Sequence, residues 1–381
     1  MKIIIKLNLL LRYLIFSRFV FRLPSKKKIL IYDNNNVKFF KNFLPSKDIT
    51  ILFTRGEQFN ISVIIKNFFK FKFSKRDYYN SYIQHVEPKI MITFSDNDLT
   101  FLQLQKFSAK KVIVQNAWKT EYDDHLFRNI KKTKKKFKFN LDYVFVFNKY
   151  FGEKYKILTN CKYINIGSFK SNLIKIKKNK LYDILFISSW KNVEPNRKVT
   201  QDLTWEKFNY VQDSLIKYLG NFSKNNKKSF FIYGKSTLPR LIEKEYEYYN
   251  KLLKNCNWKF IVGNRDKSYN IIDNSKLNIT LNSTLGYESF TRGTKTIFFS
   301  LRPKKKFLLS LKFGWPAKIN NRGYFWTDSL DETYCDKMLF RVIGLNSTKW
   351  KKIQSKYNEK LMVSNPNNTK FRSFIKKTVY N

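Results

Sequence analysis

The chain has 381 residues, of which 75 are Lys or Arg and 28 are Asp or Glu, so its formal net charge at pH 7 is +47. Its hydrophobic content of 43% and aromatic content of 18% exclude an intrinsically disordered chain, and its length indicates two domains. The three cysteines, Cys161, Cys256 and Cys335, are far apart, which excludes a disulfide scaffold and a zinc site, so we expect free thiols.

The basic excess is distributed along the chain rather than gathered in one tail. It accompanies many Asn, Ile, Phe and Tyr residues, a bias typical of an AT-rich genome that places Lys at solvated positions. The aromatic residues fall inside apolar strand runs, where burial explains them. We therefore expect attraction to phosphate-bearing partners in general but no specific nucleic-acid partner.

The N-terminal segment, residues 1–25, is apolar but carries Lys6, Arg12, Arg18 and Arg22. These charges exclude a membrane-spanning helix over residues 3–23, and the segment lacks the cleavage site of a signal peptide. Two alternatives stay open. The segment is either a basic helix in the interface of an anionic membrane, or an N-terminal helix packed on the body of the protein.

Short apolar runs, each followed by a polar loop, alternate with helical segments such as 61–73 and 99–107, which is typical of parallel strands buried on both faces. The first set of expected strands is 29–32, 49–53, 89–94, 111–115, 143–147 and 163–168. After a Lys-rich break, the second set is 182–189, 229–234, 258–261, 277–281 and 296–299.

This alternation predicts an α/β fold with two doubly wound, Rossmann-like halves that face a cleft. The first half spans residues 26–170 and the second spans 180–345, and a helical tail follows over 346–381. Ligands of such sheets bind outside the carboxyl ends of the strands, so the loops at those ends are where we expect the chemistry.

One strand-to-helix loop carries a dense set of polar residues and glycine. Ser283 and Thr284 place hydroxyl groups where the first N–H groups of a helix are unpaired and where the helix dipole favours an anion. We expect Gly286 to let a ligand approach the backbone and Glu288 to reach the hydroxyls of a ribose. The loop therefore predicts a phosphate site, although an ordinary Ser N-cap would explain Ser283 by itself.

The string Asn282-Ser283-Thr284-Leu285-Gly286-Tyr287-Glu288, with Arg292-Gly293 and Lys295 after it, resembles the donor-side motif of surface carbohydrate biosynthesis proteins. It is more distantly similar to the capsule Kdo transferases and to other GT-B glycosyltransferases. Segments of the first half, including Thr54-Arg55-Gly56-Glu57 and Ile92-Thr93-Phe94-Ser95-Asp96-Asn97, resemble the same family, so the resemblance covers most of residues 20–345.

Two loops depart from the pattern of that family. Ala117 stands where the pattern has Gly, in a loop that the resemblance places on the acceptor side of the cleft. Ser189-Trp190-Lys191 replaces a Gln and an aromatic residue that usually follow the first Ser of that loop. These departures predict a changed acceptor or reduced activity.

The resemblance implies a glycosyltransferase of bacterial capsule or lipopolysaccharide biosynthesis, which passes a sugar from a nucleotide-sugar donor to a glycan or lipid-linked acceptor. Such an enzyme usually needs no metal, and we expect no cofactor, because helix dipoles and basic side chains stabilise the leaving phosphate. We expect it in the cytoplasm or peripherally on the inner face of the cell membrane. The alternatives are a nucleotide-sugar epimerase of the same fold and a non-catalytic binding protein.

Candidate side chains follow from this scheme. Lys235, after a strand of the second half, is placed to meet a phosphate. The base that activates the acceptor hydroxyl must come from the first half, where we favour Asp96 and then Glu57. Asp98 fits the N-cap of a helix that begins at Leu99. His125 is a further candidate base.

Overall fold

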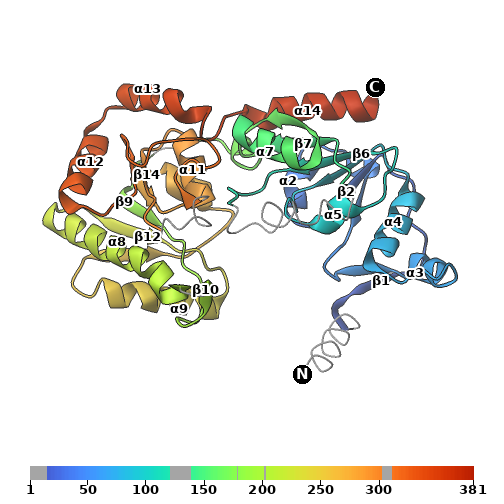
Figure 1. Ribbon diagram of the computed structural model, residues 1–381, viewed down its shortest axis with the longest axis horizontal. Helices are drawn as coiled ribbons and strands as arrows, with labels where there is room; N and C mark the ends of the chain where they lie inside the picture. The colour runs from blue at the N-terminus through green and yellow to red at the C-terminus, as the bar shows by residue number, and fades with distance from the viewer. Residues whose placement is uncertain (1–14, 121–138, 178, 201–202, 303–310) are drawn as a thin grey trace. The chain divides into compact units, whose positions relative to one another are not determined.

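The computed structural model describes residues 15–120, 139–177, 179–200, 203–302 and 311–381 (Figure 1). The described chain divides into two compact units, each built around its own six-stranded parallel sheet. Unit 1 contains residues 15–116, 139–170 and 365–381, and unit 2 contains residues 117–120 and 171–364 apart from the gaps just given. The expected α/β class is thereby confirmed.

The sheet of unit 1 has the order β3-β2-β5-β6-β7-β8. β3 pairs on one side of β2 and β5 on the other, so the order in which successive strands are added reverses at β2. Its strands are β2 (Ile29–Tyr32), β3 (Ile49–Leu52), β5 (Ile90–Thr93), β6 (Lys110–Val114), β7 (Tyr143–Val146) and β8 (Lys162–Asn165). The helices described in this unit are α2 (Val37–Lys41), α3 (Ile61–Phe68), α4 (Lys75–Val86), α5 (Leu99–Gln103), α7 (Lys149–Thr159) and α14 (Thr369–Ile375). Every residue of β2 and β5 is buried, as helices on both faces of a parallel sheet require.

The sheet of unit 2 has the order β13-β12-β9-β14-β15-β16. β12 and β13 are added on one side of β9 and the later strands on the other, so the order of strand addition reverses at β9. Its strands are β9 (Tyr182–Ile187), β12 (Phe230–Tyr233), β13 (Trp258–Ile261), β14 (Ser275–Thr280), β15 (Thr296–Phe299) and β16 (Trp326–Thr327). Its described helices are α8 (Trp205–Asn225), α9 (Pro239–Leu252), α10 (Ser268–Asp273), α11 (Thr284–Thr291), α12 (Glu332–Gly344) and α13 (Ser347–Asn358). A small antiparallel pair, β10 (Lys198–Thr200) and β11 (Leu203–Thr204), precedes α8.

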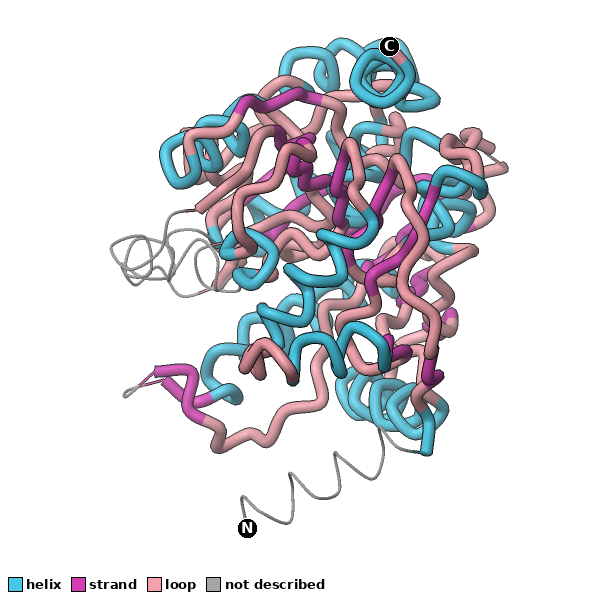
Figure 2. The backbone as a smooth tube through the Cα atoms, turned by 90° about the vertical axis from the view of Figure 1, so that its right-hand side faces the viewer, coloured by secondary structure: helices cyan, strands magenta, loops and turns pink. Residues whose placement is uncertain are grey.

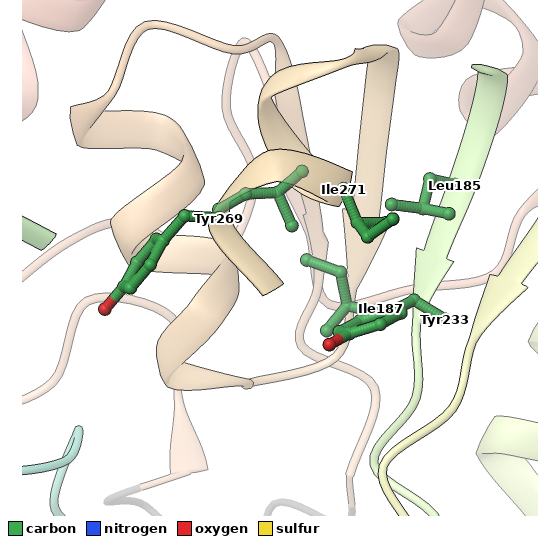
Figure 3. Close-up of a cluster of buried hydrophobic side chains, with 6 residues drawn as sticks. Leu185, Ile187, Tyr233, Tyr269 and Ile271 are labelled. Atoms are coloured by element: carbon green, nitrogen blue, oxygen red, sulfur yellow. The ribbon is translucent and has the colours of Figure 1, made fainter. Parts of the chain in front are cut away.

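A buried cluster packs α10 against the sheet of unit 2. Leu185 and Ile187 come from β9, Tyr233 from the end of β12, and Tyr269 and Ile271 from α10 (Figure 3). Alternate apolar residues of β9 therefore face a helix, which is the packing that the apolar runs of the sequence predict. All strands expected between residues 29 and 299 are present.

The N-terminal helix expected over residues 3–23 does not continue through residues 18–20. Arg18–Val20 forms β1, which pairs in parallel with β4 (Gln58–Asn60) and places Phe19 opposite Phe59. Their rings stack with centroids 6.2 Å apart, so an aromatic cross-strand contact replaces a helix turn. Residues 1–14 lie outside the described residues. Within the described ranges, we find no helix that is both long and apolar enough to cross a membrane.

The expected tail over 346–381 is not one separate element. Helix α13 belongs to unit 2, whereas residues 365–381 pack in unit 1, where Figure 2 shows the C-terminal helix nearly end-on. The ring of Phe371 lies 5.1 Å from that of Phe145 and 4.9 Å from that of Phe169, and Tyr380 donates a hydrogen bond to Asp48. The apolar face of this helix therefore completes the core of the first half.

The cysteine prediction is confirmed. All three cysteines are free thiols, with Cys161 and Cys335 buried and Cys256 partly exposed. Burial raises the pKa of the Cys161 thiol, which makes it a packing residue rather than a reactive one.

Candidate functional site

The strand order of unit 2 indicates where a ligand of this sheet is expected. The chain runs from β9 out to β12 and β13, then returns to β14 on the other side of β9. In doubly wound sheets, ligands bind at such a reversal, outside the carboxyl ends of the strands. The loop after β9, residues 188–190, and the loop after β14, residues 281–283, flank this position.

The two hydroxyls expected at the phosphate site lie at this reversal. Ser283 is the N-cap of α11, and its Oγ accepts a hydrogen bond of 3.3 Å from the N–H of Leu285. Thr284 Oγ1 accepts a 2.9 Å bond from the N–H of Trp118. In both bonds the hydroxyl acts as acceptor, so its own hydrogen can still be donated to an anion.

The N–H groups of this turn are less available than the sequence predicted. The N–H of Ser283 donates to Thr280 Oγ1 at 3.2 Å, and that of Gly286 donates to the Ser283 carbonyl at 3.0 Å. The predicted phosphate would therefore meet the two hydroxyls and the dipole of α11 rather than a set of unpaired backbone N–H groups.

The structure gives Gly286 a packing role that the sequence did not suggest. A Cβ at this position would lie 2.4 Å from Thr280 Cγ2 and 3.3 Å from Phe298 Cε1, both of which belong to the sheet beneath α11. The close packing of the helix on β14 and β15 is therefore enough to require glycine here, and the approach of a ligand to Gly286 stays a prediction. A small residue in this position brings the start of α11 close to the strand ends.

Glu288 is buried, with 3% of its surface exposed, and its Oε1 accepts a 2.9 Å bond from the hydroxyl of Tyr269. The neighbouring Arg292 forms a buried ion pair with Asp273, with 2.5 Å between Nη2 and Oδ2, and its guanidinium lies 4.9 Å from the centre of the Tyr269 ring. The back of α11 is thus fixed to α10 by polar contacts. The ribose contact of Glu288 stays a prediction.

An aromatic contact that the sequence did not suggest supports the same turn. Trp118 stacks on Tyr287, with ring centroids 3.6 Å apart and planes 4° from parallel, and both rings are buried. The hydroxyl of Tyr287 accepts a bond from the N–H of Gly314, and burial raises its pKa. We expected residues 117–119 to bear on the acceptor side, but the structure packs them beside the donor motif. No local pattern in the sequence reveals a contact over so long a separation.

Lys235 is exposed at the carboxyl end of β12, as expected. The backbone N–H groups at this strand end, however, already donate to a carboxylate of the protein. The N–H groups of Lys235 and Ser236 donate to the carboxylate of Glu245 at 3.0 and 2.8 Å. Glu245 is fully buried, and its Oε1 also accepts a bond from the hydroxyl of Ser188. Any phosphate contact at this strand end is therefore left to the Lys235 side chain.

Arg302 is a further cation beside the motif, and sequence reasoning missed it. It follows β15, its Nη1 donates a 2.9 Å bond to Asn282 Oδ1, and its guanidinium lies 4.8 Å from the centre of the Phe208 ring. Its place just after a strand end is the signal that could have identified it.

The strand reversal of unit 1 brings together three polar residues, Asp33, Arg55 and Ser95, of which Arg55 and Ser95 belong to the strings 54–57 and 92–97 that resemble the family. Asp33 follows β2, has a positive φ of 74°, and is 2% exposed. Its Oδ2 accepts bonds from Arg55 Nε and Nη2 at 3.1 and 2.7 Å, and from the hydroxyl of Ser95. Within the described part of the chain, its buried Oδ1 has no hydrogen-bond partner.

The expected bases lie around this group. Asp96 directly follows Ser95, is 3% exposed, and accepts a 2.9 Å bond from the N–H of Asn116. Glu57 is half-buried and accepts a 3.0 Å bond from the N–H of Arg55. Asp98 caps α5 through a bond from the N–H of Thr100, which confirms the N-cap prediction. His125 lies outside the described residues.

Comparison with solved structures shows the fold. A structure of the wall teichoic acid polymerase TagF aligns with a TM-score of 0.53 at 12% identity, over 93% of this chain and 90% of that chain. Another TagF structure aligns with a TM-score of 0.50 at 12% identity, over 93% of this chain and 90% of that chain. A glycosyltransferase from Rickettsia africae ESF-5 aligns with a TM-score of 0.49 at 12% identity, over 94% of this chain and 100% of that chain.

Among curated proteins, none matches this chain in sequence. A family model does match, with the description "putative O-antigen biosynthesis protein", over residues 112–379, which is more than half of the chain. The expected membership of a surface carbohydrate family is confirmed, whereas the distant similarity to Kdo transferases stays a prediction. The chain thus belongs to the family of putative O-antigen biosynthesis proteins, and its two Rossmann-like halves give it the fold of GT-B glycosyltransferases.

Proposed function

We propose that the protein is a glycosyltransferase that moves a sugar from a nucleotide-sugar donor to a surface glycan or lipid-linked acceptor. One observation carries the proposal. Ser283 and Thr284 present hydroxyls at the start of α11, where the sheet of unit 2 reverses its strand order. The family and the fold agree with this reading, since the fold is that of glycosyltransferases and the family is described by O-antigen biosynthesis.

Unit 2 takes the donor in this proposal. The hydroxyls of Ser283 and Thr284 donate to the diphosphate, and the dipole of α11 adds positive potential. Arg302 beside Asn282 and Lys235 at the end of β12 supply cations for the charge that develops on the leaving nucleotide. We propose that these groups replace a metal ion, as electrostatic stabilisation by fixed donors allows.

Unit 1 takes the acceptor. Asp96, or else Glu57, removes the proton of the acceptor hydroxyl as it attacks the anomeric carbon of the sugar. Asp33 accepts a second, neighbouring hydroxyl of the acceptor at Oδ1, the oxygen for which the described residues offer no partner, while Arg55 and Ser95 fix its other oxygen. A lipid-linked acceptor would place the enzyme peripherally on the inner face of the cell membrane.

The test is a binding and turnover panel with CMP-, UDP- and GDP-sugars. We expect one nucleotide to bind by calorimetry in buffer with a chelator, and its sugar to appear on an added lipid-linked or glycan acceptor by mass spectrometry. An isomerised sugar formed without acceptor would indicate the epimerase instead. Binding without any product would indicate a non-catalytic protein, and binding that requires a divalent ion would contradict metal independence.

A further inference from the structure

Helix α3 of unit 1 ends in a group of exposed phenylalanines. Its inner face is ordinary, since Val63 and Asn67 are buried. The surface accessibilities of Phe68, Phe69, Phe71 and Phe73 are 63%, 76%, 85% and 69%, and Ile64 and Ile65 are exposed beside them. Single exposed apolar residues are common on proteins, but a contiguous apolar group marks an interaction site. We call these six residues the α3 apolar surface.

The rings form one continuous group even though solvent reaches them. Phe68 lies 5.8 Å from Phe73 and 6.0 Å from Phe69, and Phe71 lies 6.5 Å from Phe73, measured between ring centroids. The chain folds back after the helix because Phe71 has a φ of 53° and the N–H of Lys72 donates to the Asn67 carbonyl. A bulky residue with positive φ is uncommon, and here it turns the aromatic side chains outward as a group.

The surface continues onto the neighbouring strand. Helix α3 and β1 lie side by side in Figure 1, and the hydroxyl of Ser62 donates to the carbonyl oxygen of Phe21. Phe21 is 72% exposed and Phe16 is 79% exposed. Two parts of the chain that are more than forty residues apart in sequence therefore supply exposed aromatic rings to one side of unit 1.

The charges within the segment that carries these rings have one sign, although Glu57 and Asp77 adjoin its two ends. Residues 58–76 contain no Asp or Glu, and their cations are Lys66, Lys70, Lys72, Lys75 and Arg76. On the β1 side, the exposed Arg18 and Arg22 flank Phe19 and Phe21. The first carboxylate that follows, Asp77, is engaged in the capping box of α4 with Ser74. An apolar protein partner would not require this many cations, whereas a bilayer with anionic headgroups would attract each of them.

We propose that the α3 apolar surface binds an anionic lipid bilayer. The phenylalanine rings enter the boundary between headgroups and acyl chains, and the surrounding Lys and Arg side chains meet the lipid phosphates. The proposal deepens the proposed peripheral placement and rests on it for its biological sense. It assigns the contact to α3 and the turn after it, rather than to the N-terminal segment alone.

The experiment is flotation of the full chain with vesicles of phosphatidylcholine, with and without 30% phosphatidylglycerol. The first variant replaces the four exposed phenylalanines together: Phe68→Ser, Phe69→Ser, Phe71→Ser and Phe73→Ser. Because each ring would lose its apolar transfer into lipid, we expect partitioning into anionic vesicles to fall at least a hundredfold. The matched control removes four scattered exposed apolar side chains and should partition like wild type: Ile157→Ser, Leu181→Ser, Tyr210→Ser and Leu238→Ser.

A second variant tests the charges. Lys66→Gln, Lys70→Gln and Lys72→Gln together should lower binding to anionic vesicles at least tenfold at low salt and leave binding to neutral vesicles unchanged. Flotation requires no sugar transfer, so its failure would leave the donor panel unaffected, and failure of that panel would leave flotation unaffected.

Three results would overturn the proposal. The first is wild-type flotation by the phenylalanine variant. The second is loss of flotation on deletion of residues 1–14 with no effect of the phenylalanine variant, which would give the membrane contact to the N-terminal segment. The third is a wild-type protein that does not bind vesicles and is an oligomer by light scattering, together with a phenylalanine variant that is a monomer. That result would make the surface a contact between copies.

Discussion

The hydroxyls of Ser283 and Thr284 each have an acceptor role within the protein, and this limits what their loss should do. Thr284 Oγ1 receives the N–H of Trp118, so its removal loosens a loop as well as a ligand contact. Ser283 Oγ receives the N–H of Leu285 at the longer distance of 3.3 Å, so its contribution to the fold is smaller. A charged phosphate would form stronger bonds with both than the backbone does.

We predict that Ser283→Ala combined with Thr284→Ala weakens nucleotide binding at least tenfold, because a hydrogen bond to a charged group contributes about 1.5–3 kcal/mol. Calorimetry with the nucleotide found in the panel measures the change. The control is Ser214→Ala with Ser355→Ala, whose hydroxyls donate to carbonyls of their own helices. Unchanged affinity in a folded double variant would rule out the phosphate site.

We predict that Asp96→Asn lowers the rate of sugar transfer by about 10²–10⁴-fold, the usual contribution of a general base, while nucleotide affinity stays near that of wild type. The physical reason is that the amide cannot take the proton of the acceptor, although it can still accept the N–H of Asn116. Glu57→Gln is the comparison. If both variants transfer sugar at close to the wild-type rate, the base lies elsewhere, and His125 is the next residue to replace.

Lys111 gives a prediction about pH. It is 2% exposed, its Nζ donates to the Leu102 carbonyl, and burial lowers its pKa to about 7, with Asp142 opposing the shift. The unfolded chain keeps the ordinary pKa of 10.5, so between pH 7 and 10.5 it binds more protons than the folded chain, and stability rises with pH. The penalty of the buried ammonium is fully present below pH 7.

Lys111→Met should therefore raise the midpoint of thermal unfolding by several degrees at pH 6, and the gain should shrink as the pH approaches 10. Thermal scans of both proteins across this range measure the difference. Lys156→Met, at an exposed position of α7, serves as the comparison and should show no such trend. A gain that stays constant with pH would mean that packing, not charge, causes it.

At the scale of elements, the position of α11 depends on a single missing methyl group. The helix packs so closely on β14 and β15 that any side chain at Gly286 would meet Thr280. The stack of Trp118 on Tyr287 also holds this helix. The start of α11, and with it Ser283, is therefore placed by the sheet beneath it and by Trp118.

We predict that Gly286→Ala destabilises the protein by about 1–3 kcal/mol, the usual effect of overpacking, and also weakens nucleotide binding because α11 must move. Chemical unfolding and calorimetry measure the two effects. Gly344→Ala is the matched control, since a Cβ at that end of α12 would meet nothing within 4 Å. A fully stable Gly286→Ala variant would show that the helix can shift without loss.

The helices and strands differ in how well the sequence predicts them. Buried parallel strands such as Ile29–Tyr32 are continuous apolar runs, and this pattern has few competing explanations. Arg18–Val20 was missed because a basic and aromatic segment also suits an interfacial helix, and its partner Gln58–Asn60 is too short to stand out. Helix α3 was expected to reach residue 73 but ends at Phe68, because the turn that follows depends on the conformation of Phe71.

The residues of the candidate site also differ in whether a local sequence pattern identifies them. The donor motif was found because Ser283, Thr284 and Glu288 are neighbours in sequence and lie after a predicted strand. Glu245, Trp118 and Asp33 were missed because each acts through residues far away in the chain, or ends a strand as an ordinary polar residue would. Local sequence patterns predict helices, strands and their ends. They do not predict which distant side chain contacts the loop at the end of a strand.

At the scale of the whole molecule, unit 1 is built from separate stretches of chain. Residues 365–381 follow all of unit 2 in sequence and yet belong to unit 1. Phe371 and Phe374 contact the rings of Phe145 and Phe169, and Lys89 Nζ donates to the Val379 carbonyl. These contacts cover a part of the unit 1 core that residues 15–170 alone would leave open.

We predict that a chain that ends at Ser364 loses several kcal/mol of stability in unit 1, because the buried side chains of Phe371, Ile375 and Val379 are removed together. Differential scanning calorimetry should show one transition moved to lower temperature, while calorimetric titration of the nucleotide shows unchanged affinity in unit 2. The variant Phe371→Ala should move the same transition by a smaller amount. A loss of nucleotide affinity without that transition shift would contradict the assignment of these residues to unit 1.

The return of the chain to unit 1 also sets an order of events on the ribosome. While unit 2 is being synthesised, the nascent first half has no α14 to cover Phe40, Phe145 and Phe169, so an apolar face stays open for the time that roughly 200 residues take to emerge at 5–20 residues per second. Unit 2 has no such wait, since its sheet is complete before residue 365 appears. The half made first is thus the half finished last, and chaperones that shield nascent apolar surfaces should act mainly on unit 1.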